Sequence, residues 1–491
     1  MAAALLFSFA GASPRAEARA SRDPATVAKK EEQLGPVLAV VSLAKQRIWV
    51  WGRPGLIAQS AISTGMPGHR TPMGVFSVVQ KSKFHRSNIY WNAPMPYMQR
   101  ITWSGVTLHA GDVPGYPASH GCIRLPHRFA VELWGMTKIG ARVVVAANDA
   151  AVLPIERSLL PVPKLTPAPG AESGHPQAAK TEGNAQGGGT SVSVVKVANA
   201  SANSPSPPTE LLNPLEHARL VKALAVANAA AKAKAAKSAF DAAAAKAAAA
   251  RSAVASLRAS ESAVASARAR QEATAKAIDK TTTTEMAARA KGALATAELR
   301  LAEAEKANEE ARALEAAETA EAFAAAKAAT QADAASHEAA AAVKAAERGT
   351  EPVSIFVSKK AKRVYIRQAW APIYEAPVAF KDAEFPVGTH VYLAVAAEDN
   401  GETLHWLSVS LRPSAATQAP KRGPEPASAA GASRSEPSQE TAASALARFE
   451  LSEETKSYIA ERLWAGASLI VSDEGISNET GTYTDFIVLT R

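Results

Sequence analysis

The sequence contains a single cysteine, Cys122, in 491 residues. An intramolecular disulfide and a cysteine-based zinc site each need at least two thiols, so both are excluded. Aromatic residues make up only 6% of the chain although 47% of it is hydrophobic, which means that alanine supplies much of the apolar fraction. At about 100 to 200 residues per domain, the length predicts about three units. One large hydrophobic core is therefore not expected, and Cys122 is left with either burial or chemistry.

Acidic residues are scarce in one segment of the chain. Between Pro36 and Ala147 there are 12 Lys and Arg residues but only two acids, Asp112 and Glu132, whereas the rest of the chain is close to neutral. A compact basic segment predicts an anionic partner. No zinc-finger spacing, RNP-like aromatic motif or phosphate-binding glycine-rich loop accompanies the charge, so nucleic acid is not the expected partner.

The amino terminus has a short apolar run, residues 2–12, followed by the small-residue pattern Ala16-Glu-Ala-Arg-Ala20. This pattern is typical of a secretory signal peptide, and the run is too short to span a membrane. We expect residues 1–20 to be removed and the protein to act in the periplasm or cell envelope, although no basic residue precedes the run. In an oxidising compartment a lone thiol is a liability unless it is buried or used.

Composition divides the remaining chain into a multidomain arrangement. Residues 36–147 hold short Val-, Ile- and Thr-rich runs separated by Gly and Pro, the pattern of a mostly β domain. Residues 150–214 predict a flexible Pro/Gly/Ser linker. Residues 352–491 predict a second β-rich domain, interrupted by a disordered insert at 413–445. The strands expected in the first domain lie within residues 37–50, 58–64, 74–79, 105–109 and 141–146.

Residues 215–348 form the most unusual segment, with 58 alanines and neither Trp nor Tyr. Such a composition predicts helix from intrinsic propensity. Four consecutive threonines, residues 281–284, interrupt it, and Thr282 with Glu285 fits a capping box for a second helix.

The two arms of this segment, residues 215–280 and 285–348, carry net charges of +7 and −4. Folding back would pair a basic helix with an acidic one, as in an antiparallel coiled coil. Val226, Phe240 and Val254 recur at multiples of seven and predict a thin heptad seam. The alternative is a solvated, partly disordered Ala-rich spacer.

The C-terminal region repeats part of the first domain. Residues 356–366 match residues 40–50 at a constant offset of 316, and Pro72-Met-Gly74 then matches Pro386-Val-Gly388 after the loss of two residues. Homology predicts the same strand order in both regions, and coincidence between short strands is the alternative. The second region has no cysteine, and residues 472–477 stand where a nucleophile turn is expected. We interpret it as a degenerate, non-catalytic copy that binds the wall or a partner.

The chemistry of the chain is concentrated between Thr107 and Leu125. A thiol attacks an acyl carbon only as a thiolate, so Cys122 needs a nearby base, and His109 and His120 are the candidates. Gly121 permits a sharp turn before the nucleophile, and backbone amides in such a turn can face a developing oxyanion. A buried, inert cysteine is the alternative.

The run Ser119-His-Gly-Cys-Ile-Arg124, with its upstream histidine, ISTG at 62–65 and TPMGVF at 71–76, resembles the L,D-transpeptidase (YkuD-like) family over residues 36–147. The resemblance implies a mostly β catalytic domain that remodels peptidoglycan through a covalent thioester. It makes Cys122 the nucleophile and His109 the proton donor and acceptor. It also implies that His120, Gly121 and Ser119 shape the turn and oxyanion pocket, and that Arg124 binds a substrate carboxylate.

The resemblance also implies the partners. Peptidoglycan stem peptides would lose a terminal D-alanine to the thiolate, no cofactor would be needed, and the acyl group would pass to an amine. Alternatives are an L,D-carboxypeptidase that uses water and a non-catalytic peptidoglycan-binding tether. The helical region is the expected contact for an envelope protein. His69, His85 and His127 are expected to be loop or surface histidines without a role.

Two departures from the family pattern concern the same loop. The interval between His109 and Ser119 is short, and Ala110 stands where a serine often follows the histidine. We therefore expect a short loop over the cleft and an altered donor specificity.

Overall fold

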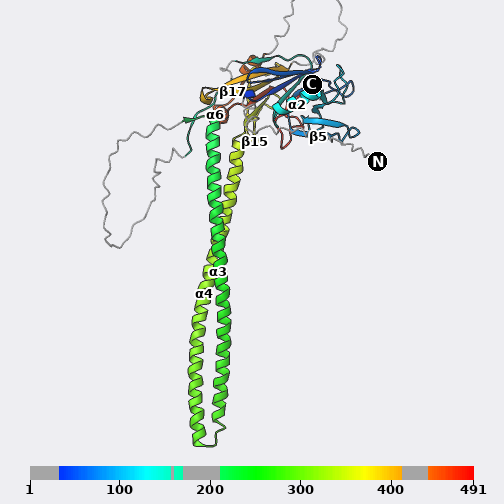
Figure 1. Ribbon diagram of the computed structural model, residues 1–491. Coiled ribbons are helices and arrows are strands. Elements are labelled where there is room, and N and C mark those ends of the chain that lie inside the picture. The colour runs from blue at the N-terminus through cyan, green and yellow to red at the C-terminus, as the bar shows by residue number, and fades with distance from the viewer. Residues whose placement is uncertain (1–32, 156–159, 170–210, 412–440, 491) are drawn as a thin grey trace, which may run out of the picture. The chain divides into compact units, whose positions relative to one another are not determined.

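The computed structural model describes residues 33–155, 160–169, 211–411 and 441–490 (Figure 1). The predicted signal peptide, most of the predicted linker and most of the predicted insert lie outside these ranges. The described residues divide into two compact units, one that joins the N-terminal and C-terminal β regions and one formed by the helical region. The sequence predicted two separate β domains, not a shared unit. No helix among the described residues combines the length and apolarity that crossing a membrane requires.

The first sheet has six strands in the order β21-β4-β9-β1-β2-β3. Strand β1 (LAVVS) is buried at every position, since both of its faces are covered. Ala39 and Val41 face the core of the N-terminal region, whereas Leu38 and Val40 belong to a second cluster shared with the C-terminal region. The strands are β1 Leu38–Ser42, β2 Arg47–Gly52, β3 Gly55–Ala61, β4 Gly74–Ser77, β9 Arg142–Ala146 and β21 Val488–Leu489.

A four-stranded sheet, in the order β5-β6-β7-β8, lies between β4 and β9 in the sequence. It is followed by helix α2, which buries Phe129, Leu133 and Met136 in the same core as Ile123 of β8. Of these four strands, only β7 was expected from the sequence. Strand β5 (QKSKFHR) shows no alternation of apolar and polar residues that would predict a strand with one buried face. The elements are β5 Gln80–Arg86, β6 Pro94–Arg100, β7 Thr107–Ala110, β8 Ile123–Leu125 and α2 His127–Met136.

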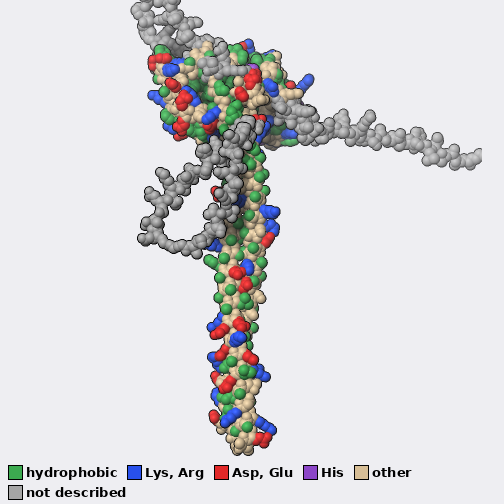
Figure 2. Space-filling model, turned by 90° about the vertical axis from the view of Figure 1, so that its left-hand side faces the viewer, with side chains coloured by type: hydrophobic (Ala, Val, Ile, Leu, Met, Phe, Trp, Pro, Cys, Tyr) green, Lys and Arg blue, Asp and Glu red, His purple; other side chains and the backbone are tan. Residues whose placement is uncertain are grey.

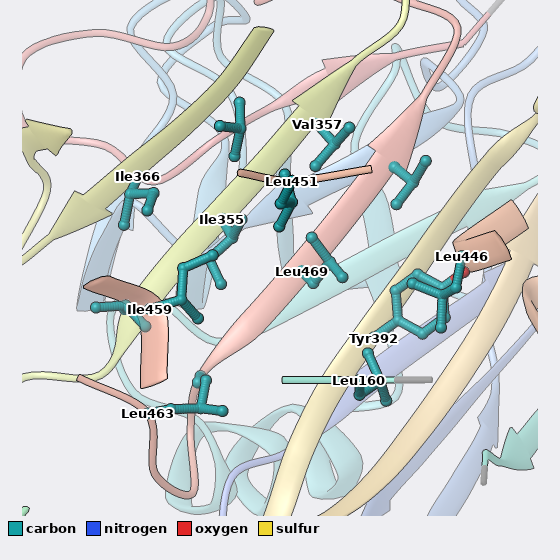
Figure 3. Packing of buried hydrophobic residues seen from close by; sticks show 14 of the residues in the cluster. Leu160, Ile355, Val357, Ile366, Tyr392, Leu446, Leu451, Ile459, Leu463 and Leu469 are labelled. Carbon is teal, nitrogen blue, oxygen red and sulfur yellow. The ribbon is translucent and has the colours of Figure 1, made fainter. Parts of the chain in front are cut away.

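The C-terminal region forms a seven-stranded sheet in the order β10-β18-β17-β20-β13-β14-β15. Figure 3 shows Ile355, Val357 and Leu469 of this sheet packed against Leu451 and Ile459, which lie on or beside the covering helices. The strands are β10 Val152–Pro154, β13 Val353–Ser358, β14 Arg363–Gln368, β15 Ala371–Pro377, β17 Thr389–Glu398, β18 Thr403–Leu411 and β20 Ser468–Ser472. The short elements beside it are β16 Ala379–Phe380, η2 Asp399–Gly401, α5 Ala442–Ala447, β19 Phe449–Glu450 and α6 Glu453–Ala460.

Five strands of the second sheet repeat five strands of the first. The order β17-β20-β13-β14-β15 matches β4-β9-β1-β2-β3, and each set contains one parallel pair, β13 with β20 and β1 with β9. A β-bulge interrupts the β2–β3 hairpin after Val50 and its counterpart, the β14–β15 hairpin, after Ile366. In the turns of the preceding hairpins, β1–β2 and β13–β14, the residue with positive φ is Gln46 (48°) in one and Lys362 (51°) in the other. The two bulge positions and the two turn positions each differ by the offset of 316 found in the sequence. The two β regions therefore share local irregularities as well as strand order.

The pairing registers correct two details of the predicted repeat. Val75 pairs with Val144 and Val391 with Ile470, so the offset of 316 continues through β4 and β17 without the loss of two residues. Residues 472–477 follow β20, the counterpart of β9, and therefore do not stand at the place of a nucleophile turn. Within the described ranges, the chain between β17 and β20 forms β18, α5, β19 and α6 instead of a four-stranded sheet.

The two predicted disordered segments contain ordered pieces. Strand β10, inside the predicted linker, pairs with β18, and Leu160 is buried in the core of the C-terminal region. Helix α5 begins at Ala442, inside the predicted insert, and its N-cap Thr441 forms a capping box with Ser444. Part of the predicted linker therefore forms a strand of the second sheet. Two-stranded pairing also joins β11 Thr166–Pro167 with β12 Leu211–Leu212.

The two β regions share a buried polar contact as well as apolar side chains. Arg142 of β9 is 2% exposed and lies 3.1 Å from a carboxylate oxygen of Asp485. Its guanidinium also donates to the hydroxyls of Ser354 and Ser468, each at 2.8 Å, and to the carbonyl of Phe486 at 2.9 Å. The charge is thus paired and almost fully hydrogen-bonded, which buried charges require.

The helical unit consists of two long helices, α3 Pro214–Ile278 and α4 Thr284–Gly349. Each is about 100 Å long at 1.5 Å per residue. The N-cap of α4 is Thr283, which accepts a hydrogen bond from the Met286 amide, rather than the predicted Thr282. Alanine-rich composition therefore produces helix as expected, with the break at the predicted threonines.

Ion pairs join the two helices in antiparallel register. Lys246 pairs with Glu321, and Arg268 lies 2.8 Å from Glu305. Both pairs place the base on α3 and the acid on α4, as the opposite net charges predicted, and Figure 2 shows the charges spread along the helices rather than gathered in one patch. Each exposed pair contributes little on its own.

The predicted heptad seam is wrong for two of its residues. Val226 and Phe240 are 47% and 50% exposed. The buried side chains of the hairpin are mostly alanines, Ala236, Ala253 and Ala329 among them. Alanine lets two backbones approach closely, so the helices meet through small side chains and leave the larger ones at the surface.

Candidate active site

A pocket of about 960 Å³ is lined by the four-stranded sheet, the turn before β8 and the loops around them. Its charged and titratable lining is almost entirely basic. Asp112 is the acid among the lining residues, whereas the bases and imidazoles are His85, Arg100, His109, His120, Arg124 and His127. Two of the 12 Lys and Arg residues of the basic segment, Arg100 and Arg124, thus line this cavity.

Strand register places the candidate nucleophile on the pocket side of the sheet. In the parallel pair β7–β8, Leu108 is opposite Ile123 and His109 is opposite Arg124. Leu108 and Ile123 are buried in the core, so His109 and Arg124 point to the other face. Cys122 immediately precedes β8 and falls on this second face, where the Thr107 hydroxyl lies 3.4 Å from its sulfur. The sequence order His…Cys therefore becomes a spatial cluster.

The turn before Cys122 is closed by the Ser119 side chain. Ser119 is 1% exposed, and its hydroxyl donates to the Cys122 carbonyl at 2.5 Å and accepts from the Gly121 amide at 3.1 Å. Gly121 has φ +113°, a conformation that L side chains rarely adopt. The Gly121 amide is consequently engaged inside the turn rather than open to a ligand.

The upstream motifs hold this turn from behind. Thr71 accepts a hydrogen bond from the Gly65 amide at 2.9 Å and donates to the Gly121 carbonyl at 2.8 Å. Gly65 forms an isolated bridge with Ser119, and a Cβ added to it would lie 1.9 Å from the His69 carbonyl oxygen. ISTG and TPMGVF therefore support the SHGC turn, although more than 40 residues separate the first of them from it in the sequence.

His109 is buried and neutral at pH 7. Burial lowers its pKa below 6.5, and the positive charges of Arg124 and His85 lower it further, whereas a hydrogen bond to Ala110 opposes the shift. The Nδ1 atom lies 2.9 Å from the Ala110 carbonyl oxygen. A carbonyl can only accept, so Nδ1 carries the proton and Nε2 keeps the lone pair. A neutral imidazole with a free nitrogen is what a general base requires.

The thiol of Cys122 is partly buried and contacts the start of β7 and the loop before it. Its sulfur lies 3.8 Å from the Gly105 carbonyl oxygen, in addition to the Thr107 hydroxyl. Within the described residues, no hydrogen bond joins it to His109 in this state. Catalytic hydrogen bonds are often long before substrate binds. The placement of Cys122 and His109 on the same face of the sheet is therefore more informative than the present side-chain rotamer of Cys122.

His120 occupies a different place from His109. Its side chain is exposed and its ring stacks on Tyr90, with centroids 4.7 Å apart, and meets His69 edge-on at 4.9 Å. His69, His85 and His127 were expected to be loop or surface histidines without a role; the structure places His85 and His127 in the pocket lining and His69 against His120.

Arg124 and Arg100 bring two guanidinium groups to the pocket. The aliphatic stem of Arg124 covers Gly111, and no ion pair or hydrogen bond of its guanidinium is present within the described ranges. Arg100 pairs with Thr107 across β6–β7, so it lies on the same face as Thr107, whose hydroxyl contacts Cys122. Its Nε is buried without a partner. Sequence reasoning missed Arg100 because β6 was not recognised as a strand.

The donor sets of the described residues do not suit a metal. No group of three or more His, Cys, Asp or Glu side chains among them is placed to hold an ion. The four-histidine lining of the pocket lacks the convergence that ligation needs.

Residues 36–145 match the family model of the YkuD L,D-transpeptidase catalytic domain. The resemblance seen in the sequence is thereby confirmed for this segment. It contains every landmark described above, from the ISTG motif to Arg124. Members of this family are peptidoglycan transpeptidases.

Several solved L,D-transpeptidases are similar to about a quarter of the chain. A cysteine-to-serine mutant of the Enterococcus faecium enzyme is 30% identical, with 23% of this chain and 50% of that chain covered and a TM-score of 0.21. The enzyme from Stackebrandtia nassauensis is 28% identical (23% and 56% covered, TM-score 0.22), and one from Mycobacterium smegmatis is 23% identical (23% and 58%, 0.22). This chain thus spans little more than half the length of these neighbours. No curated protein sequence matches it.

The charge of Arg124 acts on His109 of the YkuD domain, which gives a prediction. Arg124→Gln removes a positive charge that lowers the His109 pKa, so that pKa rises. We expect the acid limb of the pH–rate profile for Cys122 acylation to move to higher pH. Stopped-flow acylation between pH 5 and 8 measures this, with exposed Arg128→Gln as the control. A limb that stays in place or moves to lower pH would contradict it.

Proposed function

We propose that this chain is an exported L,D-transpeptidase that acylates Cys122 with a peptidoglycan stem peptide and passes the acyl group to an amine. The observation that carries the proposal is the placement of Cys122 and neutral His109 on one face of the β7–β8 pair, inside a basic pocket. Stem peptides carry several carboxylates, which such a pocket attracts.

The reaction has two balanced steps. In the first, Nε2 of His109 takes the thiol proton and the Cys122 sulfur attacks the carbonyl carbon that is bonded to the terminal D-alanine. The C–N bond breaks, the proton passes to the departing amine, and a thioester remains. In the second, an acceptor amine attacks the thioester, gives its proton to His109 and releases the thiol. No electrons change hands and no cofactor is needed.

Other residues of the site have supporting roles in this scheme. Ser119 and Gly121 hold the turn that carries the nucleophile. His120 and Tyr90 form a wall beside the entering peptide. The guanidinium of Arg124 receives a stem carboxylate, for which its planar donor fork is suited.

Intact-protein mass spectrometry tests the enzyme proposal. Incubation with tetrapeptide muropeptides or with a carbapenem should add one acyl group to the parent protein and none to Cys122→Ala. Tryptic mapping should place the adduct on Cys122. Absence of any adduct on the folded parent would overturn the proposal and leave a peptidoglycan-binding tether.

A second measurement separates transfer from hydrolysis. Addition of an acceptor stem should yield cross-linked dimers with loss of one D-alanine per bond formed. Tripeptide products alone, with dimers absent at saturating acceptor, would make the chain an L,D-carboxypeptidase.

The remaining parts of the chain complete the proposal. We infer that residues 1–20 direct export and that the C-terminal sheet is a degenerate copy without a nucleophile, since the sole cysteine is Cys122. The helical hairpin would present its charged surface to an envelope protein. Separation of periplasmic and cytoplasmic fractions tests the location.

A further inference from the structure

A loop of the C-terminal region contacts the YkuD domain beside the nucleophile. Residues 473–487 run from β20 of the second sheet to β21, which pairs with β4 of the first sheet. On this path the Glu479 carboxylate accepts hydrogen bonds from the amides of Trp103, at 2.6 Å, and Ser104, at 3.2 Å. These amides belong to the turn between β6 and β7.

The turn between β6 and β7 is built to present those two amides. Thr102 accepts from the Val106 amide at 2.9 Å and from the Ser104 hydroxyl at 3.0 Å, which closes the turn on itself. Gly105 completes it with φ +113°. The Trp103 and Ser104 amides are left side by side, and one carboxylate bridges both. Hydrogen bonds to an ionised acceptor are stronger than neutral ones.

The same turn reaches the thiol from its other end. The Gly105 carbonyl oxygen is one of the recorded contacts of the Cys122 sulfur. Trp103, Ser104 and Val106 line the pocket. A carboxylate on the outside of the turn therefore restrains the backbone that faces the nucleophile.

The carboxylate is itself held by an ordered loop. The Glu479 amide donates to the Ser477 hydroxyl at 3.1 Å, and the Gly481 amide donates to the Glu479 carbonyl at 3.1 Å. Arg367 of β14 donates to the carbonyls of Gly481, at 2.8 Å, and Thr484, at 2.6 Å. The restraint thus runs from the second sheet to the pocket through consecutive hydrogen bonds.

We propose that Glu479 is a positioning residue for the Cys122 site, so that the C-terminal region, which has no nucleophile of its own, orders the active-site turn of the YkuD domain. It acts on Cys122 through the 102–106 turn and does not touch substrate. This role deepens the proposed function. Of the three measurements described below, only the rate of acylation rests on that function. Sequence reasoning could not reach it, since more than 370 residues separate Glu479 from the amides it binds.

Three variants of the full-length chain test the proposal. Glu479→Ala removes the acceptor, Glu479→Gln keeps an acceptor oxygen without the charge, and exposed Glu384→Gln is a matched control in the same region. The first readout is amide hydrogen exchange in peptides covering residues 101–106. The second is the rate of Cys122 alkylation by iodoacetamide across pH. The third is the rate of acylation by a carbapenem.

We expect amide exchange in residues 101–106 to become about tenfold faster in Glu479→Ala, which corresponds to the loss of about one charge-assisted hydrogen bond. The increase should be smaller in Glu479→Gln. The pH profile of alkylation should change in Glu479→Ala and be partly restored in Glu479→Gln. Acylation should slow about tenfold through its rate constant rather than its binding constant. Glu384→Gln should behave as the parent throughout.

Two results would overturn the proposal. One is unchanged exchange in Glu479→Ala; the other is faster exchange with alkylation and acylation as in the parent, which would make the contact purely structural. If the parent is alkylated but never acylated, the proposed enzyme function fails while exchange and alkylation still decide the role of Glu479. Glu479→Gln, which keeps the side-chain shape, serves if Glu479→Ala does not fold.

Discussion

Replacement of His109 by glutamine is expected to slow acylation of Cys122 by about two to four orders of magnitude, the usual contribution of a positioned general base. Glutamine approximates the size of the imidazole and can still donate to the Ala110 carbonyl, but it cannot take the thiol proton near neutral pH. The rate of adduct formation with a carbapenem, followed by mass spectrometry, measures the effect.

The pH dependence of the same reaction gives an independent check. Because burial lowers the His109 pKa below 6.5, His109 in the parent stays a free base down to that range, and the rate falls only at lower pH. The acid limb should disappear in His109→Gln. His337→Gln, at an exposed histidine of α4, is the control and should leave rate and limb unchanged. A loss below tenfold in His109→Gln would mean that another group is the base.

The second large effect concerns stability. Asp485→Ala should lower the free energy of unfolding of the β unit by about 3 to 5 kcal/mol, because it leaves the buried Arg142 guanidinium without a counter-charge. The Asp485 side chain is 15% exposed, so solvent screens the pair only weakly. It also accepts from the Ser354 hydroxyl at 2.6 Å, and this hydrogen bond is lost too. Urea unfolding followed by tryptophan fluorescence measures the change.

A double variant separates the unpaired charge from lost packing. Arg142→Met combined with Asp485→Leu removes both charges and should recover much of the stability. Exposed Glu384→Ala should change stability by less than about 0.5 kcal/mol, as is usual for surface sites. If Asp485→Ala costs less than about 1 kcal/mol, the ion pair does not hold the two β regions together.

The parts of the fold that sequence predicted are those with strong local patterns. The valine-rich strands β1 and β9 and the alanine-rich helices were expected nearly where they occur. Strands β5 and β6 were not, because β5 carries mostly charged and polar residues and β6 contains two prolines, which argue against a strand. Arg100 was missed with them, since its role depends on the register of β6 against β7.

The candidate site was predicted through its motif and completed by contacts between distant segments. Cys122 and His109 could be named from residue chemistry and resemblance. Thr71, Thr107 and Glu479 could not, because their hydrogen bonds to the nucleophile turn or its neighbour join segments far apart in the chain.

The repeat shows how a short motif misleads. Pro386-Val-Gly388 looked like Pro72-Met-Gly74, yet in the structure the amides of Val387 and Gly388 bind the Asp473 carboxylate at 2.9 and 2.7 Å. That turn has its own local reason to contain glycine. The hairpin match upstream was reliable because it extended over many positions and included the bulge.

Strand β21 has a consequence for the order in which the protein matures. This strand closes the edge of the first sheet at β4, and it is made only after the helical hairpin and the whole second sheet have been synthesised. During synthesis the β4 edge of the first sheet therefore stays unpaired until β21 has been made. Pairing between strands so far apart in the chain is slow. The first sheet is therefore complete only when the last described strand of the chain has been made.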